Sequence, residues 1–539
     1  MTQQVKVRER QIRLTLYELD EETLEKKGKK PICELFQFQT VFALNSIPDA
    51  VIVPLLGENI QTKKKSKEVP LAKLHQLVEK TAPVGVYVSF ITRYNSKSNR
   101  TDMQYWPKGE TCIFKGYIRA YNAGVSAYKA FVSFTITHWL TALANISLLT
   151  TASSVNNPDH IALRTYGIAA VGEGASKVWG QFKLAEGLKL SKVWETGIKQ
   201  LFLQVLQWGD TREEKDKLNP FVKKERKRIK LVLDKIESDS MDLHANTESG
   251  LSQLNTLIAG CLKMDNYPSF INTCAWRKLI QVYAPMFLFA VVPRVDKASI
   301  IPVPCVVDKD RAIELTGKDV FQMQMAPFMP RQVSRVICTA DIGPAKVNTS
   351  VGEPYYVSYG VYPPLGEVKE GMVNVIALPG WLCQVIPTKP VGNSFPSVYE
   401  KPKVDNVKKN QEKVKKANDV QKTVGQCYAK YAYLVQSYNN TVATISTPFR
   451  MDICPGAMVK VHIDGSKHDI TMYGTVASVQ INLQAGTTPA NTTIQLTNIR
   501  SEEAINDKID NPKDGAGYYK QQWSGKGEAL YAEKANARA

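Results

Sequence analysis

The sequence predicts an α+β protein that is mainly antiparallel β, with a helical insertion and a small β-barrel near its C-terminus. Three observations predict this fold. Apolar and polar residues alternate near both ends of the chain, a helical period replaces this alternation between them, and prolines and glycines punctuate residues 300–403. The 539 residues suffice for two to four domains, and the hydrophobic share of 44% is typical of folded proteins.

Residues 1–136 are expected to form a first β-domain. Ile12, Leu14 and Leu16 alternate with polar residues, and the same pattern recurs over residues 128–136. Residues 121–124, Tyr-Asn-Ala-Gly, are turn formers. We therefore expect residues 113–120 and 127–136 to pair as a hairpin around that turn.

The rest of the chain is divided by changes in period. Residues 137–299 carry apolar residues three to five apart, which predicts a helical insertion, and residues 300–403 return to a second β section. Residues 404–446 are rich in lysine and helical in period, which predicts a long helix. Alternation then predicts a small antiparallel β-barrel over 447–506, and the polar residues 507–539 an extended C-terminal arm.

The net charge of +18 is compatible with a nucleic-acid partner. The densest basic runs lie at residues 63–65 and 223–228, and neither has the interleaved aromatic residues of a single-strand binder. Solvated faces, or contacts with an acidic protein neighbour, are therefore favoured over nucleic acid.

Cysteine spacing and hydropathy indicate the cellular compartment in which the protein is assembled. The nine cysteines are scattered singly, without a disulfide framework or a metal-binding CxxC pair, which predicts reduced thiols in a protein assembled in a cytoplasm. Apolar stretches fall short of the roughly 18 to 20 residues that a membrane span needs, so no membrane anchor is expected.

Catalytic motifs are not found in the sequence. It has no GxxxxGK phosphate loop, no GxSxG elbow and no HExxH pair, so neither an enzymatic activity nor a cofactor is expected. His462 and His468, with Asp464 and Asp469, can in principle hold a cation, but exposed polar residues on a hairpin are the simpler interpretation and no metal is expected. His138 is interpreted as a buried, hydrogen-bonded residue rather than a catalytic one.

Two segments go beyond generic patterns. The first contains Phe114 and Gly116, followed by the strand that ends in His138 and Trp139. The second is Thr-Pro-Phe-Arg-Met-Asp-Ile-Cys-Pro-Gly over residues 447–456, followed by Gly474 and closing at Arg500. Both resemble the late-control family of baseplate or tail hub proteins from contractile-tailed bacteriophages, which is related to the hub part of type VI secretion spikes.

The resemblance implies a function in assembly. It implies a structural virion protein of the tail baseplate, in which each chain contributes two tube-like β-domains to a homotrimer. The trimeric ring would adapt the hexameric tail tube to the trimeric central spike, with the tail tube protein, the spike protein and other baseplate proteins as partners. Lysine-rich segments near residues 20–30, 60–68 and 404–416 depart from the simplest members and leave the domain boundaries open.

The motif residues are expected to act through shape. Glycines 116, 456 and 474 would allow a tight backbone, Pro455 would fix a turn, and Trp139 and Phe449 would fill cores. The remaining motif residues carried by the resemblance are Phe114, His138, Arg450, Asp452 and Arg500.

Two other classes of function remain open. One is a basic nucleic-acid-binding protein of the virion or of a replication apparatus, which the net charge of +18 would favour. The other is a cell-wall hydrolase fused to a hub, although no lysozyme-like pair of acids stands out in the sequence.

Overall fold

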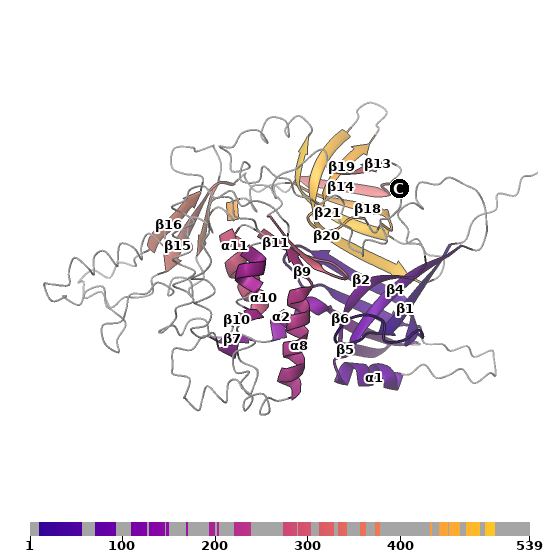
Figure 1. Ribbon diagram of the computed structural model, residues 1–539. Helices are drawn as coiled ribbons and strands as arrows, with labels where there is room; N and C mark the ends of the chain where they lie inside the picture. The colour runs from indigo at the N-terminus through magenta and orange to yellow at the C-terminus, as the bar shows by residue number, and fades with distance from the viewer. Residues whose placement is uncertain are drawn as a thin grey trace, which may run out of the picture.

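A computed structural model describes a large part of the chain, and Figure 1 shows its arrangement. The described residues are 10–55, 71–92, 109–126, 129–145, 147–149, 169–170, 193–199, 202–203, 220–238, 273–287, 289–302, 312–317, 319–327, 333–341, 356–362, 372–377, 429, 432–433, 441–450, 452–463, 470–485 and 491–501. Within this part the fold is mainly antiparallel β with few helices, so the predicted fold class is confirmed.

The first β-domain is a closed six-stranded barrel. Its strands follow the order β1-β4-β5-β6-β3-β2, and β2 pairs back with β1 to close it. Alternate residues face inward, so that Leu14, Leu16, Val84 and Val86 are fully buried, and closure leaves few free edges within the ring. The strands are β1 (Arg10–Glu18), β2 (Cys33–Ala43), β3 (Asp49–Pro54), β4 (Pro83–Thr92), β5 (Thr111–Ser126) and β6 (Lys129–His138).

A second barrel is assembled from distant parts of the sequence. Its strands follow the order β13-β19-β20-β21-β18-β14, and the short segment 317–321 links β13 to β14 at the two ends of this order. The strands are β13 (Ile313–Thr316), β14 (Gln322–Pro327), β18 (Thr441–Pro448), β19 (Met458–Ile463), β20 (Ile470–Gln484) and β21 (Asn491–Ser501).

The two barrels have the same topology. Numbered in chain order, each has the strand order 1-4-5-6-3-2. They differ at the first strand, since β13 runs parallel to β19 whereas β1 runs antiparallel to β4. They also differ in closure, because β1 pairs with β2 whereas β13 and β14 are not paired in the described residues.

The register matches as well as the order. Gly116 on β5 lies opposite Val84, and Gly474 on β20 lies opposite Val459. In both cases a bulge follows three residues later, at Arg119 in β5 and at Ala477 in β20. Equivalent buried positions are Ala50 and Ala443, Ile52 and Ile445, Val84 and Val459, Val86 and Val461, Phe114 and Met472, Ile118 and Val476, Phe134 and Ile494, and Ile136 and Leu496.

The barrels are joined edge to edge in a single sheet. Residues 470–475 of β20 pair with β19 inside the second barrel, whereas residues 478–484 pair with residues 37–43 of β2 in the first. Figure 1 shows this contact between the indigo and the yellow strands. We call this pairing of β2 with β20 the internal joint.

Helices and small sheets lie beside the barrels. The helix α1 contacts β5 of the first barrel and the longer α8 contacts α2, while a β11–β12 hairpin is extended by β9 in parallel. Their bounds are α1 (Leu71–Glu79), α2 (Ala142–Asn145), α8 (Pro220–Asp234), α10 (Ala275–Lys278), α11 (Ala284–Phe287), β9 (Ile236–Ser238), β11 (Phe289–Pro293) and β12 (Ala298–Pro302).

Further elements complete the described part of the chain. They are the 3-10 helix Trp139–Thr141, the π-helices Val193–Ile198 and Leu279–Tyr283, the sheet of β7 (Ser147–Leu149), β8 (Ala169–Ala170) and β10 (Thr273–Cys274), and the sheet of β15 (Val333–Asp341), β16 (Tyr356–Tyr362) and β17 (Met372–Ala377). Among the helices of the described residues, none has the length and apolarity that a bilayer crossing requires.

The structure corrects several boundaries. The second barrel is not confined to residues 447–506, because β13 and β14 come from the expected second β section. The expected long helix cannot extend to residue 446, since β18 begins at Thr441; most of that segment, like the expected arm over 507–539, lies outside the described residues. The expected helical insertion also contains strands β7 to β11.

The β5–β6 hairpin is confirmed but its expected turn is wrong. Residues 121–124 lie within β5, where they pair with β6, and the strands are joined by residues 127–128. Turn-forming residue types misled the prediction here, because pairing across the hairpin outweighs the weak strand propensity of Asn and Gly.

Candidate functional site

The structure brings the two sequence motifs together around the β11–β12 hairpin. His138 and Trp139, at the end of the first barrel, contact the backbone of residues 294 and 295 in this hairpin. Gly456, in the second barrel, lies against Ile301 and Val292 of the same hairpin. Residues 289–302 therefore contact both barrels beside the internal joint, and we call this arrangement the hairpin clamp.

The ring of His138 is fully buried and both of its nitrogens have partners. Nε2 lies 2.9 Å from the carbonyl oxygen of Arg294, and Nδ1 lies 3.4 Å from the backbone nitrogen of Leu140. A carbonyl can only accept and a backbone N–H can only donate, so the neutral tautomer that carries its proton on Nε2 satisfies both contacts. The interpretation of His138 as a buried, hydrogen-bonded residue is confirmed.

Burial lowers the pKa of His138 to about 3, although the hydrogen bond to Arg294 acts in the opposite direction. The unfolded chain takes up this proton near pH 6.5, whereas the native chain does not until about pH 3. The contribution of a neutral His138 to stability is therefore complete above pH 6.5 and is lost as the pH falls from there toward 3.

We expect this histidine to make the protein less stable by about 2 kcal/mol at pH 5 than at pH 7.5. The measurement is urea unfolding at both pH values for the wild type and for His138→Gln, which keeps a neutral amide donor. The variant should lose this part of the pH dependence. An unchanged pH dependence in the variant would contradict the assignment to His138.

Trp139 anchors the same hairpin through its indole. Its Nε1–H donates to the carbonyl oxygen of Val295 at 2.9 Å, and the side chain is fully buried beside the His138 ring at 4.8 Å between centroids. Phe114 packs edge-on against His138 and also contacts Phe38 and Phe42 inside the barrel. The first motif thus joins the barrel core to the clamp.

Gly116 is the position where strands β5 and β6 approach too closely for a side chain. A Cβ atom built there would lie 2.2 Å from the carbonyl oxygen of Thr137 and 3.1 Å from the Cα of His138. These are backbone atoms, so they cannot rotate away. Glycine at this position therefore sets the path by which β6 delivers His138 to the clamp.

Pro455 and Gly456 form a tight turn that faces the clamp. The backbone nitrogen of Ala457 donates to the carbonyl oxygen of Cys454 at 3.1 Å, and Gly456 has a φ of +84°. Proline second and a glycine with positive φ third define a type II turn. A Cβ on Gly456 would lie 2.6 Å from Ile301 Cδ1, so the glycine is required by conformation and by space.

Phe449, Arg450 and Asp452 stabilise the entry to this turn. Phe449 is buried in the common core of the barrels, and Arg450 is 2% exposed. The guanidinium of Arg450 binds both carboxylate oxygens of Asp452, with Nε 2.9 Å from Oδ1. Such a two-point pair holds the chain bend between β18 and β19.

Gly474 and Arg500 lie at the far end of the second motif. A Cβ on Gly474 would meet Leu496 Cβ at 3.2 Å, a tight contact with side chains rather than with backbone. The backbone of Arg500 pairs with Tyr473, and its side chain lies outside what the structure describes. The described backbone of both residues pairs within the second barrel rather than with residues 289–302, so the structure divides the expected motif residues into two groups.

Lys115 belongs to the clamp, but sequence reasoning missed it. Its side chain is 4% exposed, and Nζ lies 2.6 Å from Asp296 of the hairpin and 3.1 Å from Glu25 of the β1–β2 connection. The available signal was a lysine inside the Phe-Lys-Gly step of an otherwise apolar strand. A buried charge at such a position requires an opposite charge, which marks it as a contact between elements.

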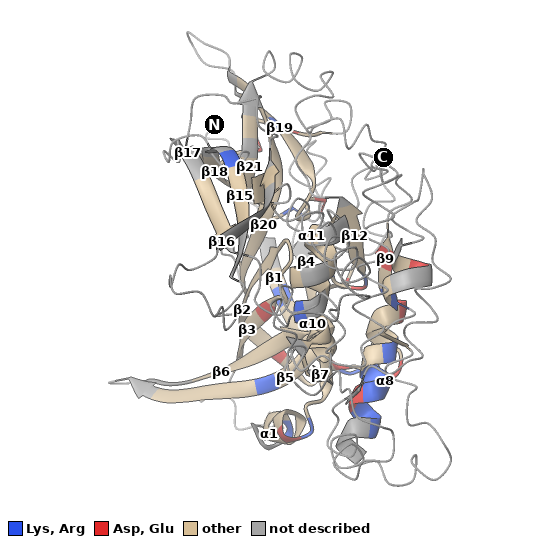
Figure 2. Cartoon of the chain, turned by 90° about the vertical axis from the view of Figure 1, so that its left-hand side faces the viewer, with Lys and Arg blue, Asp and Glu red and all other residues tan. Residues whose placement is uncertain are grey.

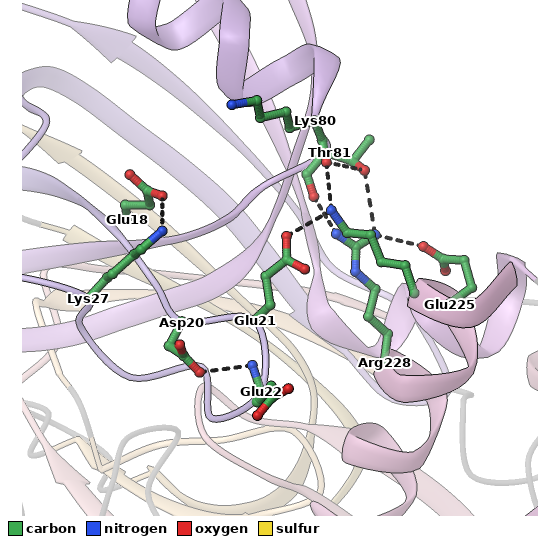
Figure 3. A network of polar contacts seen from close by, with 10 residues as sticks. Glu18, Asp20, Glu21, Glu22, Lys27, Lys80, Thr81, Glu225 and Arg228 are labelled. Carbon is green, nitrogen blue, oxygen red and sulfur yellow. Dashed lines mark hydrogen bonds and ion pairs between the residues drawn. The ribbon is translucent and has the colours of Figure 1, made fainter. Parts of the chain in front are cut away.

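The basic run 223–228 forms part of an intramolecular network. It lies on α8, where Lys224 pairs with Glu21 at 2.7 Å and Arg228 pairs with Glu225 at 2.6 Å (Figure 3). Arg228 also donates to the Thr81 carbonyl at 2.6 Å and stacks on the Tyr117 ring at 4.2 Å. Lys224 of this run thus contacts an acidic residue of the β1–β2 connection in the same chain. Figure 2 shows that Lys and Arg predominate among the charged residues of α8.

Lysines of the segment near residues 20–30 also form ion pairs within the chain. Lys26 pairs with Glu110 at 2.5 Å and lies 3.9 Å from the ring centroids of Tyr17 and Tyr87. Lys27 pairs with Glu18 at 3.0 Å. The segments 60–68 and 404–416 lie outside the described residues.

The candidate cation site has a single described member. His462 Nδ1 lies 2.8 Å from Thr471 Oγ1 across the β19–β20 pair, whereas His468, Asp464 and Asp469 lie outside the described residues. No group of three potential ligands is found in the described part of the chain. His462→Ala should therefore change the midpoint of thermal unfolding by less than about 2 °C, in a scan with and without added Zn²⁺. A zinc-dependent loss of several degrees would instead indicate a metal site.

The solved structures similar to this chain include tail proteins and a component of a type VI secretion system. A tail protein from Neisseria meningitidis is 10% identical with a TM-score of 0.40, covering 91% of this chain and 96% of that one. The 43 kDa tail protein of a Shewanella oneidensis prophage is 9% identical with a TM-score of 0.36, covering 90% and 98%. A component of the Escherichia coli type VI secretion system is 7% identical with a TM-score of 0.28, covering 87% and 74%.

Phage tails and type VI secretion systems are also the assemblies that contain the family which the two sequence motifs resemble. No protein-family model matches the sequence, and neither does any curated protein.

Proposed function

We propose that the chain is a structural hub of a phage-type tail baseplate. In this proposal three copies form a ring that adapts the hexameric tail tube to the trimeric central spike, in the virion tail after assembly in the host cytoplasm. The protein acts through its shape and its contacts rather than by catalysis, and the hydrolase and cofactor chemistries are not part of its role.

The observation that carries the proposal is the matched topology of the two barrels. Both have the strand order 1-4-5-6-3-2, with equivalent glycines and bulges in the fifth strand. A chain with two equivalent units presents six similar units when three copies assemble around one axis. Such an arrangement meets sixfold symmetry on one face and threefold symmetry on the other.

The hairpin clamp supports the same role. Each chain of an adaptor ring has to hold its two barrels at a fixed angle while force is transmitted between neighbouring proteins. Residues 289–302 make three kinds of contact with the barrels. These are the hydrogen bonds with His138 and Trp139, the Lys115–Asp296 ion pair and the packing contact with Gly456. Distributed buried contacts of this kind resist rotation of one barrel against the other.

Light scattering of the purified chain tests the oligomeric state. The proposal predicts a species of three times 60.2 kDa that persists over a tenfold dilution. A stable dimer, or a monomer that binds neither a tail tube protein nor a spike protein of the same virus, would rule the hub out.

Nucleic-acid binding is not favoured as a second function. The basic run 223–228 was one reason to consider a nucleic-acid partner. In the structure, Lys224 forms an ion pair with Glu21, and Arg228 forms an ion pair with Glu225 and a hydrogen bond with Thr81. Retention of a monomer on heparin, weakening steeply with salt, would reopen that alternative.

A further inference from the structure

The internal joint has a counterpart at each end of the chain. In the joint, residues 37–43 of the second strand of one barrel pair with residues 478–484 of the fifth strand of the other. The equivalent of the first segment is β14, residues 322–327, and the equivalent of the second is residues 120–126 of β5. Within the described residues, β14 pairs with β18 on one side, and residues 120–126 pair with β6 on one side, so each has one free edge.

Equivalent residues are buried at the internal joint and exposed at the free edge of β5. Val479 and Ile481 are fully buried beneath the internal joint. Their equivalents in the first barrel, Tyr121 and Ala123, are exposed, with Tyr121 at 49%. These two positions of the fifth strand are thus buried where the second strand of the other barrel pairs beside them, and exposed where no such strand pairs.

The two free edges carry no charged residue, which is one of the common protections against pairing, although β14 ends in Pro327. Proteins commonly protect exposed strand edges with charged residues. Neither 322–327 (Gln-Met-Gln-Met-Ala-Pro) nor 120–126 (Ala-Tyr-Asn-Ala-Gly-Val-Ser) contains a charged residue.

Among the described residues, no third strand pairs with the outer part of the β5–β6 hairpin. Beyond residue 118 it is a two-stranded ribbon that Figure 2 shows extending away from the barrel, and residues 119–123 are exposed on both of its faces. Two-stranded ribbons are only marginally stable in water, so this one gains from a third strand.

We propose that β14 of one copy pairs antiparallel with residues 120–126 of β5 in the next copy, repeating the internal joint between chains. The inference rests on the proposed ring and names the strands that close it. Transfer of the joint's register places Gln324 opposite Gly124 and Ala326 opposite Asn122. Every contact between neighbouring barrels in the ring then has the same form, whether it lies within or between chains.

A disulfide between copies tests the register. Ala326→Cys and Asn122→Cys are combined in the full chain, because directly opposite residues in an antiparallel pair lie within disulfide reach. Under mild oxidation the double variant should give a covalent ladder that ends at three chains on a non-reducing gel. A mixture of the two single variants should stop at covalent dimers.

The matched control combines Ala326→Cys with Ala120→Cys. Ala120 is two residues from Asn122 on the same strand face, so the two thiols would lie about 7 Å out of register and should not bridge. Equal crosslinking in both double variants would overturn the register.

Light scattering distinguishes failure of this interface from failure of the ring. A trimeric double variant without a bridge would overturn the β14–β5 interface and leave the proposed function standing. A double variant and a wild type that both remain monomeric at every concentration, and that bind neither a tail tube protein nor a spike protein of the same virus, would overturn both. Both substitution sites lie on a free edge, so the variants should fold as the wild type does.

Discussion

Gly116→Ala is expected to destabilise the first barrel by about 3 kcal/mol or more, at the upper end of what overpacking costs. The added Cβ would lie 2.2 Å from the Thr137 carbonyl oxygen, so strands β5 and β6 must separate. Separation moves His138 and Trp139 away from the clamp. Urea unfolding followed by circular dichroism measures the loss.

Two other glycines provide matched controls for this variant. Gly474 is the topological equivalent, but its Cβ would meet the side chains of Leu496 and Ile499 at 3.2 to 3.4 Å, so Gly474→Ala should cost only about 1 kcal/mol. Nothing lies within 4 Å of a Cβ on Gly28, and Gly28→Ala should be neutral. Equal losses in all three variants would contradict the steric explanation.

Trp139→Ala is expected to cost about 3–5 kcal/mol, because it empties a fully buried indole site and removes the hydrogen bond to Val295. The cavity lies between the first barrel and the β11–β12 hairpin. The clamp should therefore loosen, and limited proteolysis near residues 289–302 should be faster.

Trp139→Phe separates the two contributions. Phenylalanine fills most of the indole volume but leaves the Val295 carbonyl without its donor, which should cost about 1–3 kcal/mol. If the phenylalanine variant were as damaged as the alanine variant, the hydrogen bond rather than the packing would dominate. A wild-type value for Trp139→Ala would contradict the clamp itself.

Local patterns in the sequence predicted the strands well, but they could not predict how the strands pair. Alternation located β1, β6 and the strands after residue 447, because a half-buried strand imposes a two-residue period. The contribution of β14 to the second barrel escaped prediction because β14 pairs with β18, more than 100 residues away, and no local signal specifies such a partner. The same limit hid the equivalence of the barrels. Some matched pairs, such as Ala50 and Ala443, are identical, but others, such as Phe114 and Met472, share burial alone.

The candidate site was predictable only where it uses special residues. Gly116, Gly456 and Pro455 stand out in a sequence because close backbone approach and tight turns restrict residue type. The partners of His138 and Trp139 are backbone carbonyls of residues 294 and 295, which any sequence would supply. The clamp therefore became visible only once the fold placed the hairpin beside both barrels.

The basic run on α8 shows how composition can mislead. A cluster of six mostly basic residues indicates an external polyanion when it is viewed alone. In the fold, its charges face Glu21 and Glu22 of the β1–β2 connection, more than 200 residues earlier in the chain. The ion pairs of α8 within the chain therefore say more about the role of this surface than the net charge of the protein does.

The most direct test of the central claim is electron microscopy of the purified full-length chain, viewed along the axis of the particle. The account predicts a closed ring of three chains with six similar densities, because each chain supplies two barrels of the same topology and equivalent edges join them. A particle with three unequal lobes, or an open chain of subunits, would show that the barrels are not equivalent in the assembly and would contradict the account.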